Sequence, residues 1–256
     1  MAPFLRIAHR GASGSYPENT RIAFEKAIEA GADMIELDCQ LCKDGHVVVI
    51  HDEHLDRTAK VSGLVRSKTL KQLKKLDMGA WFKRSFRGQR ILTLEEVMQS
   101  VAGQVEINLD IKTVPHGPLG IELKVLFILS HYDYLHRSIL SSFDYRVLRQ
   151  LRELAPEARI GVLYGAGITE SPFQLGTEIS AHSVHVQKEL ATPQFLERAV
   201  QLGFKRFVWT LNEVVEMERF LSLGVDGIVS DFPEKFWKVR SWKGRERAHG
   251  PTIART

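Results

Sequence analysis

The sequence predicts an α/β protein of one domain, a single (β/α)8 TIM barrel, on three observations. Short apolar runs alternate with amphipathic stretches along most of the chain, which favours βαβ units and a parallel sheet. The length of 256 residues is close to the roughly 250 residues typical of one such barrel. Nine strand candidates are visible, and one of them is best explained as an antiparallel excursion, which leaves the eight that a barrel needs.

Strand and helix candidates follow one another in the order that a barrel requires. The expected strands are Leu5–Ala8, Met34–Asp38, Val47–Ile50, Val105–Asp110, Ser138–Ser142, Arg159–Tyr164, Ser183–Gln187, Arg206–Thr210 and Gly227–Ser230. The expected helices between them include Thr20–Ala30, Leu94–Val101, Pro118–His131, Tyr145–Leu154, Pro193–Leu202 and Glu213–Leu223.

The third apolar run, Val47–Ile50, does not fit a parallel sheet. Only a short link containing Lys43-Asp44-Gly45 separates it from the preceding strand, whereas a parallel crossover needs about a dozen residues or more. Asp-Gly also favours a hairpin turn. We therefore expect this run to fold back antiparallel to the second strand.

Two segments are expected to lie outside the regular pattern of a barrel that fills residues 1–240. Residues 54–90 are long for a strand–helix connection and place Leu70, Leu73 and Leu76 at helix-like spacing, so we expect a small insertion over the barrel mouth. Residues 241–256 are polar and basic and lack periodicity, which predicts a disordered or loosely docked tail.

Composition argues against several classes of protein. Hydrophobic residues make up 44% and charged residues 26% of the chain, as is ordinary for a globular domain. The net charge of +4 is mild, and we expect the Lys and Arg residues to be scattered, so no nucleic-acid partner is predicted. The longest apolar run, Val125–Leu129, is far short of the roughly 20 residues that span a membrane. Nothing in the sequence indicates the oligomeric state.

The N-terminus and the cysteines favour a cytoplasmic protein. The polar pair His9-Arg10 interrupts any apolar segment of a signal peptide. Two cysteines are too few for a disulfide scaffold. Cys39 and Cys42 are three positions apart and would point to opposite faces of an extended strand, so a shared metal is not expected and both are interpreted as structural.

Carboxylates stand on one face of two predicted strands. Glu36 and Asp38 point the same way, because alternate side chains of a strand share a face. Inside a barrel they would repel each other unless a cation lay between them, although an exposed acidic face explains an isolated Glu-x-Asp about equally well. Asp110 and Lys112 repeat the arrangement: a third metal ligand beside an anion-binding lysine is one interpretation, and a simple ion pair is the other.

Two histidines follow apolar strands, and the first of them stands at the carboxyl end of a barrel strand, where a barrel carries its active site. His9 closes the first strand with Arg10 after it, and His51-Asp52 follows the antiparallel run. One such histidine is usually structural. Two of them near a carboxylate cluster predict the acid and base of a phosphoryl-transfer site.

A polar stretch, Pro17-Glu18-Asn19-Thr20, opens the first helix. Asn19 or Thr20 can cap that helix, and Glu18 can favour its N-terminus. Capping alone would explain these residues, but Glu18 and Asn19 are also candidates to support the site.

Together these motifs resemble the glycerophosphodiester phosphodiesterase family over nearly the whole chain, from about Ile7 to Pro233. Each motif is weak alone, but their order and spacing are specific. The matching segments are His9-Arg10-Gly11, Pro17-Glu18-Asn19-Thr20, Glu36-Leu37-Asp38, Lys43-Asp44-Gly45, His51-Asp52, Leu55-Asp56-Arg57-Thr58, Leu76–Phe82, Lys112, Trp209-Thr210-Leu211-Asn212 and Gly224–Pro233.

The resemblance implies a role for each matched residue. It implies a metal site at Glu36, Asp38 and Asp110, acid–base histidines at His9 and His51, and phosphate-holding bases at Arg10 and Lys112. Asp110 departs from the glutamate usual in the family, which shortens its reach by one methylene, and Cys42 and Leu211 replace Thr and Val. Oxygen ligands alone suit Mg2+ or Ca2+.

The implied reaction is metal-dependent hydrolysis of a glycerophosphodiester to sn-glycerol 3-phosphate and an alcohol. His9 is favoured as base and His51 as acid, with Asp52 supporting it. Trp209 can stack on the glycerol carbons or belong to the barrel core. Two alternatives stay open: lysophospholipase D-like activity on lysophospholipids, and a non-catalytic barrel that binds a phosphorylated ligand. Trp81, Phe82 and Phe86 would suit a lysophospholipid by contacting its acyl chain, but such residues more often form the small core of an insertion.

Overall fold

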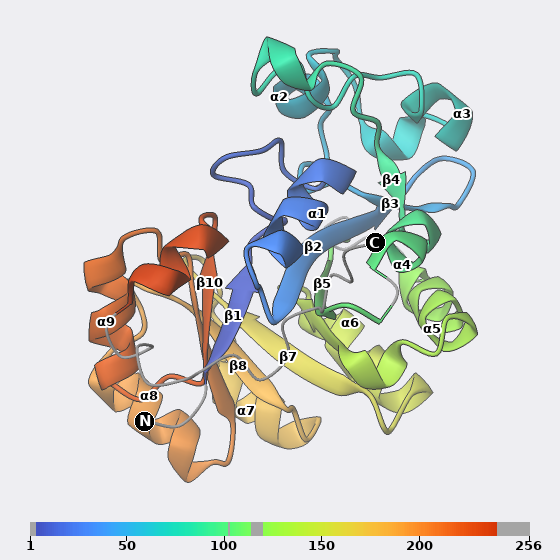
Figure 1. The fold of residues 1–256 in the computed structure, drawn as a ribbon. Coiled ribbons are helices and arrows are strands. Elements are labelled where there is room, and N and C mark those ends of the chain that lie inside the picture. The colour runs from blue at the N-terminus through green and yellow to red at the C-terminus, as the bar shows by residue number, and fades with distance from the viewer. Residues whose placement is uncertain (1–3, 102, 114–119, 240–256) are drawn as a thin grey trace, which may run out of the picture.

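The computed structural model describes residues 4–101, 103–113 and 120–239, and a closed barrel of parallel strands forms its centre (Figure 1). In order around the barrel, the strands are β1 (Leu5–Ala8), β2 (Met34–Leu41), β5 (Glu106–Ile111), β6 (Ser138–Ser142), β7 (Arg159–Tyr164), β8 (Ser183–Gln187), β9 (Lys205–Trp209) and β10 (Gly227–Ser230). Because β1 pairs with both β10 and β2, the ring is closed. The predicted fold class is confirmed.

Helices cover the outside of this barrel. They are α1 (Arg21–Glu29), α4 (Leu94–Val101), α5 (Ile121–His131), α6 (Tyr145–Leu154), α7 (Pro172–Glu178), α8 (Pro193–Gln201) and α9 (Val214–Ser222), with short 3-10 turns η3 (Leu135–Arg137) and η4 (Pro233–Lys238). The main core lies between the strands and these helices, where Ile35, Leu37 and Leu109 pack with Val97 and Leu148.

The predicted antiparallel excursion is present, and it includes a second strand that was not expected. Strand β3 (Val47–Val49) pairs antiparallel with β2, as predicted. A second short strand, β4 (Leu92–Thr93), pairs antiparallel with β3. Two residues show no periodicity, so β4 was not among the expected strands, and α4 begins directly after it.

Between β3 and β4 the chain forms a lobe beyond the barrel, which Figure 1 shows around α2 and α3. We call residues 54–90 the insertion. Its elements are α2 (Asp56–Ala59), η1 (Val65–Ser67), α3 (Leu70–Leu73) and η2 (Arg84–Phe86). Leu55, Val65 and Leu73 belong to an apolar cluster that also contains Val48 and Ile50 of the preceding hairpin, so the lobe is held to the antiparallel strands by shared burial.

Several boundaries differ from the expected ones. Helix α7 was not expected, and β2 continues beyond Asp38 to Leu41. Helix α5 begins at Ile121, and the expected start, Pro118, lies outside the described residues. The predicted tail, 241–256, also lies outside them. Cys39 and Cys42 are both free and buried. Among the described residues, none of the helices has the length and apolar character needed to cross a bilayer.

Candidate active site

The three predicted metal ligands lie together inside the barrel. Parallel pairing of β2 with β5 sets Asp38 beside Asp110 and Glu36 beside Asn108. One carboxylate oxygen from each of Glu36, Asp38 and Asp110 lies within 4.8 Å of the others, and all three residues are buried. The residues between them on both strands pack outward against the helices, so the period-two alternation expected from the sequence is confirmed.

The turn after β1 positions Glu36. The backbone N–H of Arg10 donates to Oε2 of Glu36 at 2.9 Å, and the N–H of Asn19 donates to the carbonyl of Arg10 at 3.0 Å. Arg10 and Asn19 have left-handed φ values of +54° and +56°, which are strained for residues other than glycine. Gly11 has φ +82°, and a Cβ there would lie 2.6 Å from the carbonyl carbon of Ala23.

Positive and amide groups surround Asp38. Nε of Arg10 lies 3.3 Å from Oδ2 and Nζ of Lys112 lies 3.1 Å from Oδ1, while Nδ2 of Asn19 donates to Oδ2 at 2.9 Å. Lys112 also pairs with Asp110. Burial alone would raise the pKa of Asp38, but Lys112 and Arg10 outweigh it and hold that pKa below its usual range.

At the other two carboxylates, the nearby positive charges do not outweigh burial. Burial, together with the negative charge of Asp38, raises the pKa of Glu36 to about 7. Burial also raises the pKa of Asp110 against the opposing effect of Lys112. Oδ1 of Asp110 is buried and has no hydrogen-bond partner in the described part of the chain. Acids that need more positive charge to ionise together, and an oxygen open for ligation, fit a hard divalent cation.

His9 and His51 line the same cavity as the carboxylates, with a volume of about 270 Å³. Nδ1 of His9 lies 2.6 Å from Oδ1 of Asp231, and Nδ1 of His51 lies 2.6 Å from Oδ1 of Asp52. A carboxylate at Nδ1 holds the proton there and leaves Nε2 free for chemistry. Nε2 of His9 lies 4.0 Å from Oε2 of Glu36, so this atom faces the carboxylate cluster.

The pKa values of the two histidines move in opposite directions. Burial alone would lower the pKa of His9, but the hydrogen bond to Asp231 and the charge of Glu36 raise it. Burial lowers the pKa of His51, and Asp38 only partly offsets this. A cation at the carboxylates would cancel the negative charge that raises the pKa of His9, so the assignment of base and acid stays a prediction.

Arg57 connects Asp52, the partner of His51, with Glu18, the partner of Arg10. Its Nε donates to Oδ2 of Asp52 at 2.6 Å, and its Nη1 donates to Oε2 of Glu18 at 2.6 Å. Glu18 also accepts from Nη1 of Arg10 at 2.9 Å. Glu18 therefore fixes two arginines, and Thr20, not Asn19, caps α1 by accepting from the N–H of Ala23.

Sequence reasoning gave no role to Asp231 or Arg57. Asp231 directly follows β10, and the carboxyl end of a barrel strand is the position where functional side chains are expected, so its location was a usable signal. Arg57 had no such signal, because it lies on α2 in the insertion and reaches the site through its long side chain.

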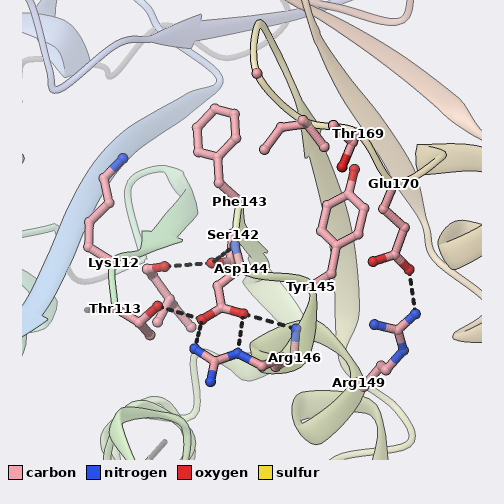
Figure 2. Close-up of a pocket in the computed structure, with 13 residues that line it drawn as sticks. Lys112, Thr113, Ser142, Phe143, Asp144, Tyr145, Arg146, Arg149, Thr169 and Glu170 are labelled. Atoms are coloured by element: carbon pink, nitrogen blue, oxygen red, sulfur yellow. Dashed lines mark hydrogen bonds and ion pairs between the residues drawn. The ribbon is translucent and has the colours of Figure 1, made fainter. Parts of the chain in front are cut away.

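Aromatic residues line the same cavity as the carboxylates. Trp209 stands at the end of β9 with its ring 5.8 Å from that of Phe143, and its indole N–H donates to the carbonyl of His185 at 3.1 Å. All three line the 270 Å³ cavity. A larger, open cavity of about 680 Å³ shares Lys112 and Phe143 with it. Figure 2 shows this second cavity, whose charged residues pair as Asp144 with Arg146 and Glu170 with Arg149.

Comparisons with known proteins show which family the chain is similar to. The model of the Glycerophosphoryl diester phosphodiesterase family matches residues 9–235. A glycerophosphodiester phosphodiesterase of Caldanaerobacter subterraneus subsp. tengcongensis is 43% identical over 231 residues, which cover 90% of this chain and 95% of that protein.

Solved structures show the same likeness. An Oleispira antarctica phosphodiesterase in complex with the product sn-glycerol-3-phosphate has a TM-score of 0.84 at 28% identity, covering 92% of this chain and 96% of that one. A glycerophosphodiester phosphodiesterase from Thermotoga maritima has a TM-score of 0.74 at 32% identity, covering 94% of this chain and 100% of that one. The resemblance inferred from the motifs is thus confirmed, and the chain belongs to the glycerophosphoryl diester phosphodiesterase family.

Proposed function

We propose that this enzyme hydrolyses glycerophosphodiesters to sn-glycerol 3-phosphate and an alcohol, with one divalent cation, Mg2+ or Ca2+, held by Glu36, Asp38 and Asp110. One observation carries the proposal: the three carboxylates and two carboxylate-paired histidines line a single cavity of about 270 Å³. The expected product is the molecule named for the related Oleispira structure.

The charges of the filled site support the cation. Three ionised carboxylates oppose the charges of Arg10 and Lys112, which leaves the site negative by one charge before a phosphodiester adds a second. A divalent cation brings the sum to zero, and when bound it supplies Lewis-acid polarisation of the phosphate and screening of developing charge. Arg10 and Lys112 bind the remaining phosphate oxygens, for which their positions beside Asp38 suit them.

The two histidines move the protons. One of them removes, at its Nε2, a proton from the nucleophile, which is water or a hydroxyl of the substrate's own glycerol, and the other donates a proton to the leaving alkoxide. If the glycerol hydroxyl attacks, water then opens the cyclic phosphate in a second step. We keep His9 as base and His51 as acid. Asp231 and Asp52 hold the imidazoles through Nδ1, and Arg57 holds Asp52 in turn.

Trp209 and Phe143 provide an apolar surface for the glycerol carbons inside the smaller cavity. The leaving alcohol then extends into the larger cavity beyond Lys112 and Phe143. Because that cavity is open to solvent, it would also admit a longer substituent, so a lysophospholipid is the second candidate substrate. We also propose a cytoplasmic location and a small-molecule substrate as the partner.

Turnover of glycerophosphocholine, measured as released glycerol 3-phosphate, tests the proposal. We expect EDTA to abolish turnover and Mg2+ or Ca2+ to restore it. His9→Ala and His51→Ala should each lower kcat by about 10²–10⁴-fold, and Glu36→Gln should weaken metal affinity. His54→Ala is the matched control, because its side chain is 67% exposed and does not line the cavity.

Two results would contradict the proposal. Ligand binding without metal-dependent turnover would indicate a non-catalytic barrel. Full activity of all three variants on the preferred substrate would refute the site assignment. Running lysophosphatidylcholine beside glycerophosphocholine distinguishes the two substrate candidates by the ratio of kcat/KM.

A further inference from the structure

The insertion carries a concentration of positive charge. Residues 60–90 contain ten Lys and Arg residues and one acidic residue, a net charge of +9, whereas the whole chain has +4, so the remainder carries −5. The expectation that basic residues are scattered is therefore wrong for this segment. The ten are Lys60, Arg66, Lys68, Lys71, Lys74, Lys75, Lys83, Arg84, Arg87 and Arg90.

Most of these charges face solvent. All except Lys68 and Lys74 are exposed. Within the described residues, carboxylate partners are found only for Arg66, which pairs with Glu53, and for Lys74, which pairs with Glu96. The net charge of the segment is thus displayed on its surface and is not cancelled by neighbouring acids.

The single acid of the segment is used to shape a loop. The carboxylate of Asp77 accepts the backbone N–H groups of Gly79, Ala80 and Gly88 at 2.9, 2.8 and 2.7 Å. A Cβ on Gly79 would lie 2.0 Å from the carbonyl oxygen of Phe86. The loop from 77 to 88 is therefore tightly closed, and it presents its basic side chains from a fixed turn.

A row of aromatic rings joins this loop to the barrel mouth. The ring centroids of Trp81 and Phe82 are 5.7 Å apart, those of Phe82 and Phe86 are 5.9 Å apart, and those of Phe86 and Tyr16 are 5.5 Å apart. All four rings are partly exposed, and Tyr16 lies in the turn that carries Arg10 and Asn19. The exposed basic side chains and the row of rings thus meet beside the active site.

We propose that the insertion docks the enzyme on membrane surfaces that contain anionic lipid. Exposed Lys and Arg side chains around partly exposed Trp and Phe are the chemistry of an interfacial membrane contact. The rings pack edge-on at interplanar angles of 88°, 60° and 59°, unlike a parallel platform for nucleic-acid bases. Docking here would face the barrel mouth toward the lipid surface, and it holds whether or not the proposed reaction is correct.

Co-sedimentation of the full-length protein with lipid vesicles tests this surface. One vesicle is pure phosphatidylcholine, and the other contains about a third phosphatidylserine. Each Lys or Arg near an anionic surface contributes roughly a fivefold gain in partitioning. The triple variant Lys83→Glu, Arg84→Glu, Arg87→Glu should therefore lose on the order of 100-fold or more in binding to the anionic vesicle.

A matched triple variant on the far side of the barrel serves as control. Arg198→Glu, Arg219→Glu, Lys238→Glu changes the net charge equally at exposed positions of α8, α9 and η4, and it should bind vesicles as the wild type does. Both variants should keep wild-type turnover of soluble glycerophosphocholine. The proposal is overturned if anionic and neutral vesicles bind alike, if both triple variants lose binding equally, or if only an oligonucleotide, run in parallel, is bound.

Discussion

Replacing Asp231 by Asn tests whether a carboxylate at Nδ1 is what makes His9 reactive. Oδ2 of Asp231 accepts from Nδ2 of Asn212 at 2.6 Å, so an Asn at this position keeps its one oxygen on that side. In the wild type, Nδ1 of His9 lies 2.6 Å from Oδ1 of Asp231, which accepts its hydrogen bond. In the variant, the amide NH2 group faces Nδ1 in place of that oxygen. The imidazole must accept there and carry its proton on Nε2, the atom that the reaction needs free.

The expected fall in kcat follows from two effects of the substitution, the loss of a hydrogen bond to a charged group and the change of tautomer. A hydrogen bond to a charged group contributes about 1.5–3 kcal/mol, or roughly 10- to 150-fold. The inverted tautomer adds to this loss, so kcat should fall by about 10²–10⁴-fold. Hydrogen bonding to His9 and its charge lower the pKa of Asp231 to about 2 against the opposing effect of burial, which corresponds to roughly 2 kcal/mol of stability at neutral pH.

Steady-state kinetics and thermal unfolding are measured together for this variant. Asp226→Asn is the matched control, because Asp226 flanks the opposite end of β10 and pairs with Arg206. It should lower the melting temperature while leaving kcat within about threefold of wild type, whereas Asp231→Asn lowers both. If Asp231→Asn retains wild-type kcat under saturating metal, the carboxylate does not orient His9, and the reasoning fails.

Three further predictions follow from single contacts. Arg57→Leu removes the cation that Glu18 and Asp52 share and should lower kcat by roughly tenfold or more through misplaced Asp52, with wild-type kcat as the contradicting outcome in the same assay. Gly11→Ala should lower the free energy of unfolding by about 2 kcal/mol or more, because φ is +82° and the new Cβ lies 2.6 Å from the carbonyl carbon of Ala23; an unchanged denaturation midpoint would refute this. The pKa values of Asp52 and Asp231 are both about 2 in the folded protein, below the ordinary value of an aspartate. The stability that their ionised forms contribute is therefore complete above about pH 4 and is lost as the pH falls toward 2. Urea titrations between these pH values should show the free energy of unfolding falling, and a flat profile would contradict the ion pairs of these two carboxylates.

The fold class could be predicted because it depends on local patterns. Strand–helix alternation and the Asp44-Gly45 turn each act over a few residues, and the structure has the parallel barrel and the antiparallel β3 that they indicated. The shared face of Glu36 and Asp38 likewise follows from the period of an extended strand. Strand β4 could not be found, because a two-residue strand exists only through its partner β3.

Local sequence patterns predicted only part of the carboxylate cluster. Local periodicity puts Glu36 and Asp38 on one face, but it is the register between β2 and β5 that sets Asp110 beside Asp38. In the same way, a count along the chain gives the insertion its charge of +9, while the closed loop of Asp77 decides that this charge is displayed beside the barrel mouth.

The sequence by itself determined the barrel, the face on which each carboxylate stands and the strand ends that carry the histidines, because these depend on neighbouring residues. Only the tertiary structure decided their partners. Asp231 meets His9 across 222 positions of sequence because β1 pairs with β10 when the barrel closes. Arg57 meets Glu18 across 39 positions because the insertion folds back over the first turn. Contacts of this range are set by closure and packing, for which no local period exists.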